Sequence, residues 1–190
     1  EIVDAEINDV NGGSIRTYIR RKNADPAAFG DATYASLARE RVKMLRDSER
    51  ELGLERKEPY LDFAFRVKRG KDDVVRFITE QVSRGKVVYV YGASTKGNTV
   101  LQYFGLDSQL VTAASERNPD KWGKVTVGTH IPIISEEDAR KAKPDYFLVL
   151  PWHFKDGIVQ QEQQFLARGG ELIFPLPRPQ VVNLKHQGAR

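Results

Sequence analysis

The sequence has no cysteine and only one methionine among its 190 residues. Without cysteine the chain can form no disulfide, no thiolate zinc site and no cysteine nucleophile. It also lacks any apolar run close to the roughly 20 residues that span a bilayer, and we recognise no signal peptide at its start. These absences indicate a soluble protein without a membrane partner, and we expect it to be cytoplasmic.

Long runs of one charge are missing too. The 30 Lys and Arg residues stand against 26 Asp and Glu residues, and the formal charge of +4 is spread along both halves. A nucleic-acid-binding protein usually shows a basic stripe or stacking aromatic residues, so the sequence predicts no nucleic-acid partner. Hydrophobic residues make up 40% of the chain, which is enough for a core. The length fits one domain, or one domain with a piece of another.

The first part of the chain alternates between strand and helix patterns. Apolar residues on both sides of residues 11–14 (Asn-Gly-Gly-Ser) predict two strands around a tight turn, because this turn requires positive φ angles. A two-stranded ribbon is marginal alone in water, so residues 1–30, hairpin and linker, should join a larger sheet. Residues 31–85 form a helical segment with apolar stripes at helical spacing, and Gly70 is a candidate break in its second helix.

From residue 86 onward, short β-branched runs alternate with helical stretches. We expect strands at residues 86–91, 110–114, 132–134, 146–150 and 171–174. This alternation predicts an α/β fold with a doubly wound, mostly parallel, Rossmann-like sheet over residues 86–182. Residues 183–190 are expected to form a tail.

Residues 92–98 form the strongest candidate site in this sheet. They follow a predicted strand and open a helix, so their N–H groups are placed to hold an anion at the ligand-binding edge of the sheet. The Walker pattern is absent, and Ser94 replaces the middle glycine of the dinucleotide fingerprint. Glu116 stands where a ribose-binding acid would lie. The alternative is that Gly92 and Gly97 only allow a tight turn.

The histidines give no sign of a metal site, because none has a partner at metal-ligand spacing. They are His130, His153 and His186. His153 follows a predicted strand at the carboxyl edge, where it would reach the same crevice as Ser94 and Lys96. The alternative is a packing corner. No catalytic triad or general base emerges from the spacing.

Five motifs in one order resemble the C-terminal domain of nucleotide-sugar (NDP-hexose) C-methyltransferases. They are residues 91–99, 116–124, 128–133, 151–154 and 174–177. In that S-adenosylmethionine-dependent family, an N-terminal zinc-binding domain and a central S-adenosylmethionine domain precede this Rossmann-like domain. The parent enzymes add a methyl group to a ring carbon of a deoxy-keto-sugar attached to a nucleoside diphosphate.

The resemblance also implies a place for the hairpin. Residues 1–21 resemble the last two antiparallel strands of the preceding methyltransferase sheet, and residues 8–14, which connect them, would face that domain's active site. Residues 1–30, hairpin and linker, would then belong to the preceding domain. The chain lacks the family's cysteine cluster for zinc, its adenosylmethionine loop and its general-base histidine. We therefore expect this chain to bind no cofactor or metal and to be inactive alone. Because it begins at Glu1 rather than Met, we expect a fragment or a processed chain.

The implied role is to bind the nucleotide-sugar substrate and to close the active site, beside the methyltransferase domain of the same parent chain. The predicted substrate-binding residues are Ser94, Thr95, Lys96, Asn98, Glu116, His153, Asn11 and Ser14. None is expected to make or break a bond. Two alternatives stay open at this point: an NAD(P)-type nucleotide-binding module, and a domain that only packs against the methyltransferase core.

Overall fold

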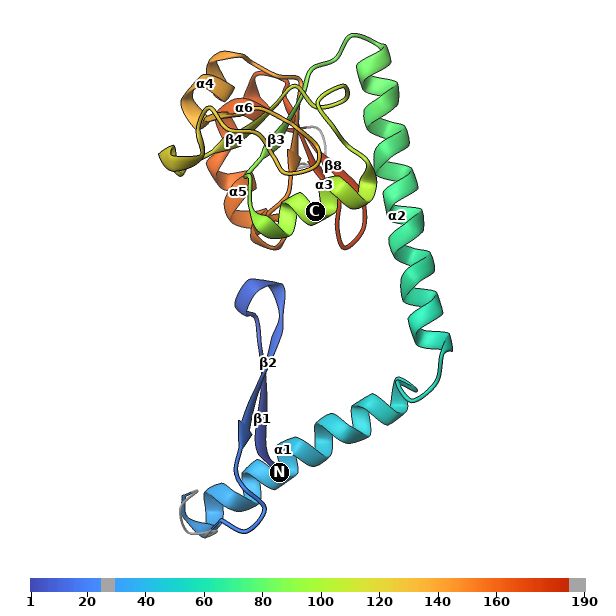
Figure 1. The fold of residues 1–190 in the computed structure, drawn as a ribbon, viewed down its shortest axis with the longest axis vertical. Coiled ribbons are helices and arrows are strands. Elements are labelled where there is room, and N and C mark those ends of the chain that lie inside the picture. The colour runs from blue at the N-terminus through green and yellow to red at the C-terminus, as the bar shows by residue number, and fades with distance from the viewer. Residues whose placement is uncertain (25–29, 185–190) are drawn as a thin grey trace. The chain divides into compact units, whose positions relative to one another are not determined.

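The computed structural model describes residues 1–24 and 30–184 and divides the chain into two compact units at residue 65/66 (Figure 1). This division lies inside helix α2 (Glu58–Ser83), whereas the sequence predicts boundaries at residues 30 and 85. The assignment of residues 1–30 to a preceding domain stays a prediction. Most of the predicted tail, residues 185–190 with His186, and part of the predicted linker, residues 25–29, lie outside the described residues.

The first unit contains the predicted hairpin. Strands β1 (Ile2–Asn8) and β2 (Ser14–Ile19) pair antiparallel, joined by the 3-10 turn Val10–Gly12. Asn11, Gly12 and Gly13 all have positive φ angles, of 55°, 85° and 118°. The turn chemistry therefore acts as the sequence indicates, since asparagine and glycine tolerate this region best. Helix α1 (Ala32–Glu51) packs against β1.

One buried carboxylate joins the hairpin to α1. Asp4 of β1 is fully buried, and its two oxygens accept hydrogen bonds from Arg41 Nε at 2.8 Å and Arg41 Nη2 at 2.5 Å. The Tyr34 hydroxyl and the Ala5 N–H donate to the same carboxylate, at 2.9 and 2.8 Å. The bonds from Arg41 chiefly outweigh the effect of burial and lower the pKa of Asp4 to about 2.

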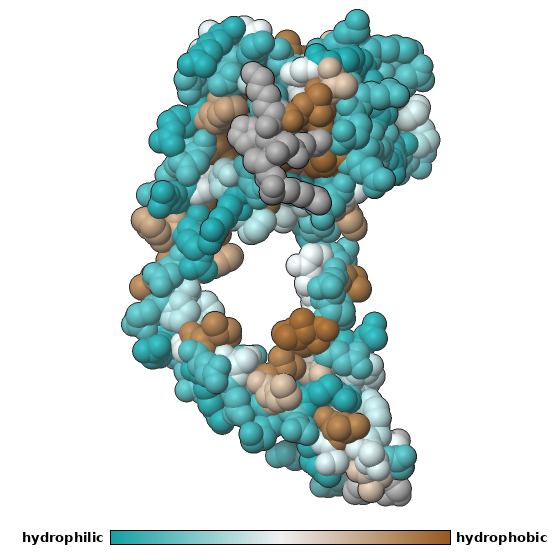
Figure 2. All heavy atoms as spheres, turned by 180° about the vertical axis from the view of Figure 1, so that it is seen from behind, coloured by the Kyte–Doolittle hydropathy of each residue, from teal (hydrophilic) through white to brown (hydrophobic). Residues whose placement is uncertain are grey.

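The apolar stripes of α1 and of the start of α2 are much more exposed than their spacing suggests, whereas Val74 and Ile78 farther along α2 are buried. Of the residues of α1, all of which the structure describes, only Ala38 is buried. Phe63 near the start of α2 is 60% exposed, and hydrophobic residues are visible at the surface (Figure 2). The expected break at Gly70 is wrong, because α2 runs without interruption through this buried glycine. A glycine costs only about 1 kcal/mol in a helix, which the 26 residues of α2 tolerate.

The second unit is built on the predicted Rossmann-like sheet. Within the described residues the sheet has the order β5-β4-β3-β6-β7-β8, with β8 antiparallel to β7 and every other neighbouring pair parallel. The strands are β3 (Val88–Tyr91), β4 (Ala113–Glu116), β5 (Ile133–Ser135), β6 (Tyr146–Val149), β7 (Glu171–Phe174) and β8 (Gln180–Val182). The α/β fold class is thus confirmed. The sequence missed β8 as a strand.

Helices lie on both faces of this sheet. Val88 and Val90 of β3 belong to one hydrophobic core, with residues of α2 and α3 (Thr95–Phe104). Tyr89 and Tyr91 belong to the other, with α4 (Glu136–Lys141), α5 (Lys155–Gln161) and α6 (Gln163–Ala167). This division follows from the alternation of side chains along a strand. Within residues 1–24 and 30–184, no helix combines the length and apolarity needed to cross a membrane.

Two elements of the second unit differ from the pattern that the sequence suggests. Strand β4 begins at Ala113 instead of 110, because the N–H groups of Leu110 and Val111 both bond to Asp107 O in a turn. The helical stretch between β6 and β7 is divided into α5 and α6 at Glu162. There the buried Glu162 carboxylate accepts a hydrogen bond from Arg140 Nη2 at 2.6 Å. Helix α4 begins at a side-chain cap, in which Ser135 Oγ accepts a hydrogen bond from Asp138 N.

Candidate functional site

The strand order reverses at β3. From β3 the chain proceeds to β4 and β5 on one side and then returns to pair β6 on the other side. Loops that leave neighbouring strands in opposite directions open a crevice at the carboxyl edge, where doubly wound proteins bind ligands. Here the two loops are residues 92–98 after β3 and residues 151–154 after β6. The predicted loop and the predicted histidine therefore meet at the switch point.

The loop after β3 is shaped by glycine and a helix cap. Gly92 has φ +85°, a region that side-chain-bearing residues rarely adopt. A Cβ on Gly97 would lie 2.7 Å from Leu150, so the glycine lets α3 approach the end of β6. Ser94 is the N-cap of α3, with Oγ accepting from Gly97 N at 3.0 Å. Its hydroxyl proton can still be donated to a ligand, and the helix N-terminus favours an anion.

Lys96 and His153 lie close to each other across the switch point. Lys96 Nζ is 5.8 Å from the centroid of the Trp152 ring, in cation–π geometry. Burial, and then the positive charge of Lys96, lower the pKa of His153 below its usual range. Its Nδ1 atom is buried and has no hydrogen-bond partner within the described residues. Lys96 and His153 are thus neighbours, and their contact with a ligand in one crevice stays a prediction.

A small cavity adjoins the start of α3. Its volume is about 220 Å³, and its polar wall includes Ser94, Thr95, Asn98 and Lys121. Asn98 Oδ1 is buried without a hydrogen-bond partner in the part of the chain that the structure describes. The cavity is below the roughly 300 Å³ of pockets for drug-sized ligands, so it has room for a phosphate or a similar group and not for a whole nucleotide.

Glu116 at the end of β4 binds the loop itself. Its Oε2 accepts from Ala93 N and from Lys121 Nζ, both at 3.1 Å, and Lys121 Nζ also donates to Ala93 O at 3.0 Å. Oε1 accepts from Asn118 N at 3.0 Å. Burial opposes ionisation, but the bonds from Asn118 N and Lys121 prevail and lower the pKa of Glu116. Both polar backbone groups of Ala93 are thus clamped.

The clamp includes a residue that the sequence prediction missed. Lys121 reaches Glu116 through the short 3-10 turn Pro119–Lys121, which begins at an Asn118 side-chain cap. The Asn-Pro pair was a signal for this turn, but no spacing rule connects Lys121 to Ala93. Direct contact of Glu116 with substrate stays a prediction. Its observed bonds give it a positioning role toward the loop.

Asn11 and Ser14 belong to the hairpin turn of the first unit. Ser14 Oγ donates to Asn8 Oδ1 at 2.8 Å, and the same oxygen accepts from Val10 N at 3.0 Å. The positive φ of Asn11 is part of this turn. These contacts explain the two residues as turn formers, and their contact with a substrate stays a prediction.

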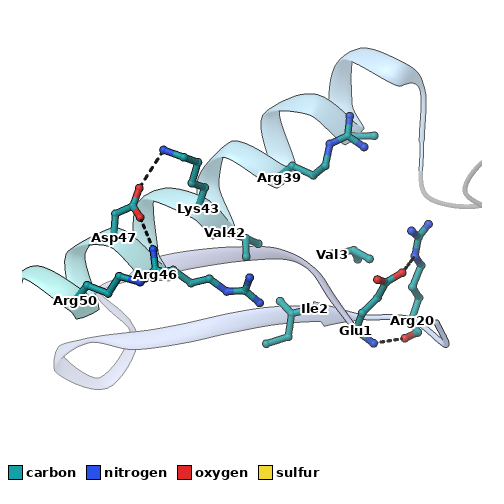
Figure 3. Close-up of a pocket in the computed structure, with 11 residues that line it drawn as sticks. Glu1, Ile2, Val3, Arg20, Arg39, Val42, Lys43, Arg46, Asp47 and Arg50 are labelled. Carbon is teal, nitrogen blue, oxygen red and sulfur yellow. Dashed lines mark hydrogen bonds and ion pairs between the residues drawn. The ribbon is translucent and has the colours of Figure 1, made fainter. Parts of the chain in front are cut away.

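The first unit also contains a larger hollow, between β1 and α1. Its volume is about 540 Å³, and its wall carries more cationic than anionic side chains (Figure 3). Glu1 pairs with Arg20, and Asp47 pairs with Lys43 and Arg50. None of the predicted substrate-binding residues lines this hollow. Across residues 1–24 and 30–184 no three His, Asp or Glu side chains are grouped for a metal.

Comparison with known proteins agrees with the motifs. Residues 9–177 match the model of the C-methyltransferase C-terminal domain. The C-methyltransferase NovU of Streptomyces niveus is 36% identical over 182 residues, which are 96% of this chain and 41% of that protein. The chain thus spans less than half of the length of this relative. With a Rossmann-like sheet and motifs in the expected order, the chain belongs to the C-methyltransferase C-terminal domain family.

Proposed function

We propose that this chain binds the substrate and closes the active site in an S-adenosylmethionine-dependent C-methyltransferase acting on a nucleotide-linked deoxy-keto-sugar. Membership of the family supports a methyltransferase. The observation that carries the proposal is the meeting of the α3 N-terminus, Lys96 and His153 at the switch point of the sheet. Ligands bind at this place in doubly wound folds.

The diphosphate would lie at the start of α3. The helix dipole and the first-turn N–H groups favour an anion there, and Lys96 adds a full positive charge. The clamp on Ala93 holds the loop in shape before the ligand arrives, so less ordering is required on binding. Thr95 and the Ser94 hydroxyl are further donors on the same turn.

His153 would meet an uncharged polar group of the sugar. Because its pKa is lowered, the imidazole is neutral at pH 7 and has one donor and one acceptor nitrogen. The buried Asn98 Oδ1 is an acceptor and would gain a hydrogen bond from a sugar hydroxyl, and the buried Nδ1 of His153 would gain a sugar hydroxyl as its partner. We assign neither residue a bond-making role.

C-methylation requires a carbanion or enolate beside a carbonyl, protected from water and held in one orientation. S-adenosylmethionine supplies the electrophilic methyl group. We propose that its site, the general base and the family's zinc lie in parts of the parent enzyme outside this chain. The chain would then contribute orientation and exclusion of water, and it would transfer no methyl group alone.

The hairpin would complete the sheet of the methyltransferase domain. Exposed apolar residues of β1 and β2, such as Ile7 and Ile19, support a protein partner for this ribbon. The loop with Asn11 and Ser14 would then face that domain's active site.

The NAD(P) alternative is weakened by two observations. Ser94 occupies the position of the middle fingerprint glycine, so the loop lacks the dinucleotide-binding pattern. Glu116, the expected ribose ligand, accepts three hydrogen bonds from the protein itself.

Titration of the chain with a nucleoside diphosphate sugar and, separately, with NAD distinguishes the proposed function from the NAD(P) alternative. We expect saturable binding of the sugar nucleotide that is weakened in the Lys96→Ala variant, and no saturable signal with NAD. Saturation by NAD alone would favour the dinucleotide module. Methyl transfer from adenosylmethionine by the purified chain would contradict the assignment of base and cofactor to other domains.

A further inference from the structure

We propose that the cavity at the carboxyl ends of β4 and β5 is the subsite for the nucleotide's base, with Trp122 as its stacking surface. This inference rests on the proposed function, because it takes the diphosphate to lie at α3. The cavity has a volume of about 350 Å³, within the range of small-molecule sites. Its walls come from the end of β4, the turn that leads to Trp122, and the β5–α4 junction.

Trp122 is the aromatic wall of this cavity. It is 44% exposed, although its indole Nε1 donates to Glu116 O at 2.8 Å and its backbone N bonds to Pro119 O at 3.1 Å. The Nε1 bond holds the ring and satisfies its polar atom, and the backbone bond closes the turn that carries Trp122. A fixed and partly exposed ring offers a π surface to a planar group at little cost in side-chain entropy.

The charges around the cavity distinguish a base from a phosphate. Glu136, Glu137 and Asp138 line it, and the cation Arg117 is already held by Glu136 and Gln161, both at 2.9 Å. A phosphate would be repelled by this rim. An uncharged base, with both donor and acceptor groups, suits a rim with guanidinium and carboxylate groups.

The subsite adjoins the proposed phosphate site through one residue. Glu116 lines this cavity, and its carboxylate holds Ala93 of the α3 loop. A nucleotide with its diphosphate at α3 would extend across the end of β4 toward β5. This is the direction in which mononucleotide-binding halves of doubly wound sheets hold their ligands.

Two probes separate the base from the phosphates: uridine diphosphate and inorganic pyrophosphate, titrated calorimetrically into the 190-residue chain. We expect Trp122→Leu to weaken uridine diphosphate binding roughly tenfold or more, as loss of a stacked base does, and to leave pyrophosphate within twofold. Trp122→Phe keeps an aromatic face and should retain most of the affinity. Lys96→Ala should weaken both probes, and Tyr103→Leu, which removes an exposed ring on α3, neither.

Fluorescence gives a measurement that does not depend on a Trp122 variant. The chain has two tryptophans, so Trp122 alone emits in a Trp152→Phe variant. Uridine diphosphate should quench this emission and pyrophosphate should not. Equal quenching by both probes, or none by uridine diphosphate while it binds, would overturn the subsite.

The outcomes distinguish the two proposals. If Trp122→Leu binds uridine diphosphate within twofold of the original chain while Lys96→Ala weakens both probes, the base subsite is wrong and the proposed phosphate site stands. If neither probe binds, or if Lys96→Ala changes neither affinity, the proposed phosphate site is wrong and the base subsite falls with it.

Discussion

Phe147 in the second unit is 1% exposed, whereas Phe63 in the first unit is 60% exposed. Phe147 lies on β6 and packs against Phe165, with ring centroids 4.7 Å apart, and against Tyr91 of β3. In the first unit the carboxylate of Asp4 is fully buried and pairs with Arg41, whose side chain is 37% exposed. Buried apolar side chains hold the Rossmann-like unit together, whereas the polar contact between Asp4 and Arg41 joins the hairpin to α1.

The comparison indicates which unit is self-sufficient. Burial of apolar surface is the main favourable contribution to folding, and the second unit has it on both faces of its sheet. The hairpin keeps large apolar side chains exposed, Ile19 at 73%. Such a surface is typical of an interaction site, which agrees with a proposed contact to the methyltransferase domain.

Phe147→Ala provides the largest expected effect. Truncation of a buried aromatic ring should lower the free energy of unfolding of the second unit by about 3–5 kcal/mol. The matched variant Phe63→Ala removes the same group from an exposed position and should change it by less than about 0.5 kcal/mol. Urea denaturation followed by circular dichroism measures both. Similar losses of unfolding free energy in the two variants would contradict the difference in apolar burial between the two units.

Asp4→Asn should destabilise the hairpin–α1 unit by about 1–3 kcal/mol, because the charge-assisted bonds with Arg41 are lost. The pH dependence of the stability of this unit gives a more specific test. Since the pKa is about 2 in the folded chain and near 4 in an unfolded one, Asp4 stabilises the unit fully above about pH 4. This stabilisation is lost as pH falls toward 2.

Hydrogen exchange of β1 amides between pH 5 and pH 2 tests this behaviour. The original chain should lose protection of these amides as the pH falls, beyond the intrinsic pH dependence of exchange. The Asp4→Asn variant should show less of this extra change, and Asp47→Asn, an exposed ion-pair control, should behave as the original chain does. Identical profiles for all three would contradict the role of Asp4.

Glu116→Gln tests the clamp in the second unit. The uncharged amide keeps the shape but weakens the bonds to Lys121 and Ala93, so the loop should bind nucleotide sugar with roughly fivefold lower affinity. Exchange of the Ala93 amide should become faster. Glu80→Gln, on the exposed face of α2, is the control and should alter neither quantity. An unchanged Ala93 exchange rate would remove the positioning role.

Removal of residues 1–22 should have the smallest effect. The second unit has its own cores, so its cooperative thermal unfolding should persist with a midpoint shifted by only a few degrees. Differential scanning calorimetry of the shortened chain measures this. Loss of the cooperative transition would mean that the hairpin is part of the Rossmann-like fold.

The second unit was largely predictable because its central strands are continuous apolar runs that lie buried in a parallel sheet, as in β3 and β6. Because ligand-binding loops follow the carboxyl ends of parallel strands, the sequence also predicted that Lys96 and His153 lie at the same edge of the sheet. Strand β8 was missed because three residues, Gln180–Val182, after a proline-rich stretch carry no measurable period.

The first unit was harder to predict for a physical reason. Helical spacing in α1 reports that one face is apolar, but it does not report whether a partner covers that face. Asp4 looks like a surface residue in the sequence, and only the tertiary contact with Arg41, 37 residues away, makes it buried. Lys121 was missed for the same reason, because its partner Ala93 lies 28 residues earlier.

The most direct test of the central claim is the Michaelis constant for the sugar nucleotide in the full-length parent enzyme. Lys96→Ala and His153→Ala should each raise this KM about ten- to hundredfold, with a smaller change in kcat, because groups that bind substrate equally in ground and transition states contribute uniform binding. The double variant should be less than additive, and adenosylmethionine affinity should stay unchanged. A KM within twofold of the original enzyme in both single variants would contradict the site and favour a purely structural domain.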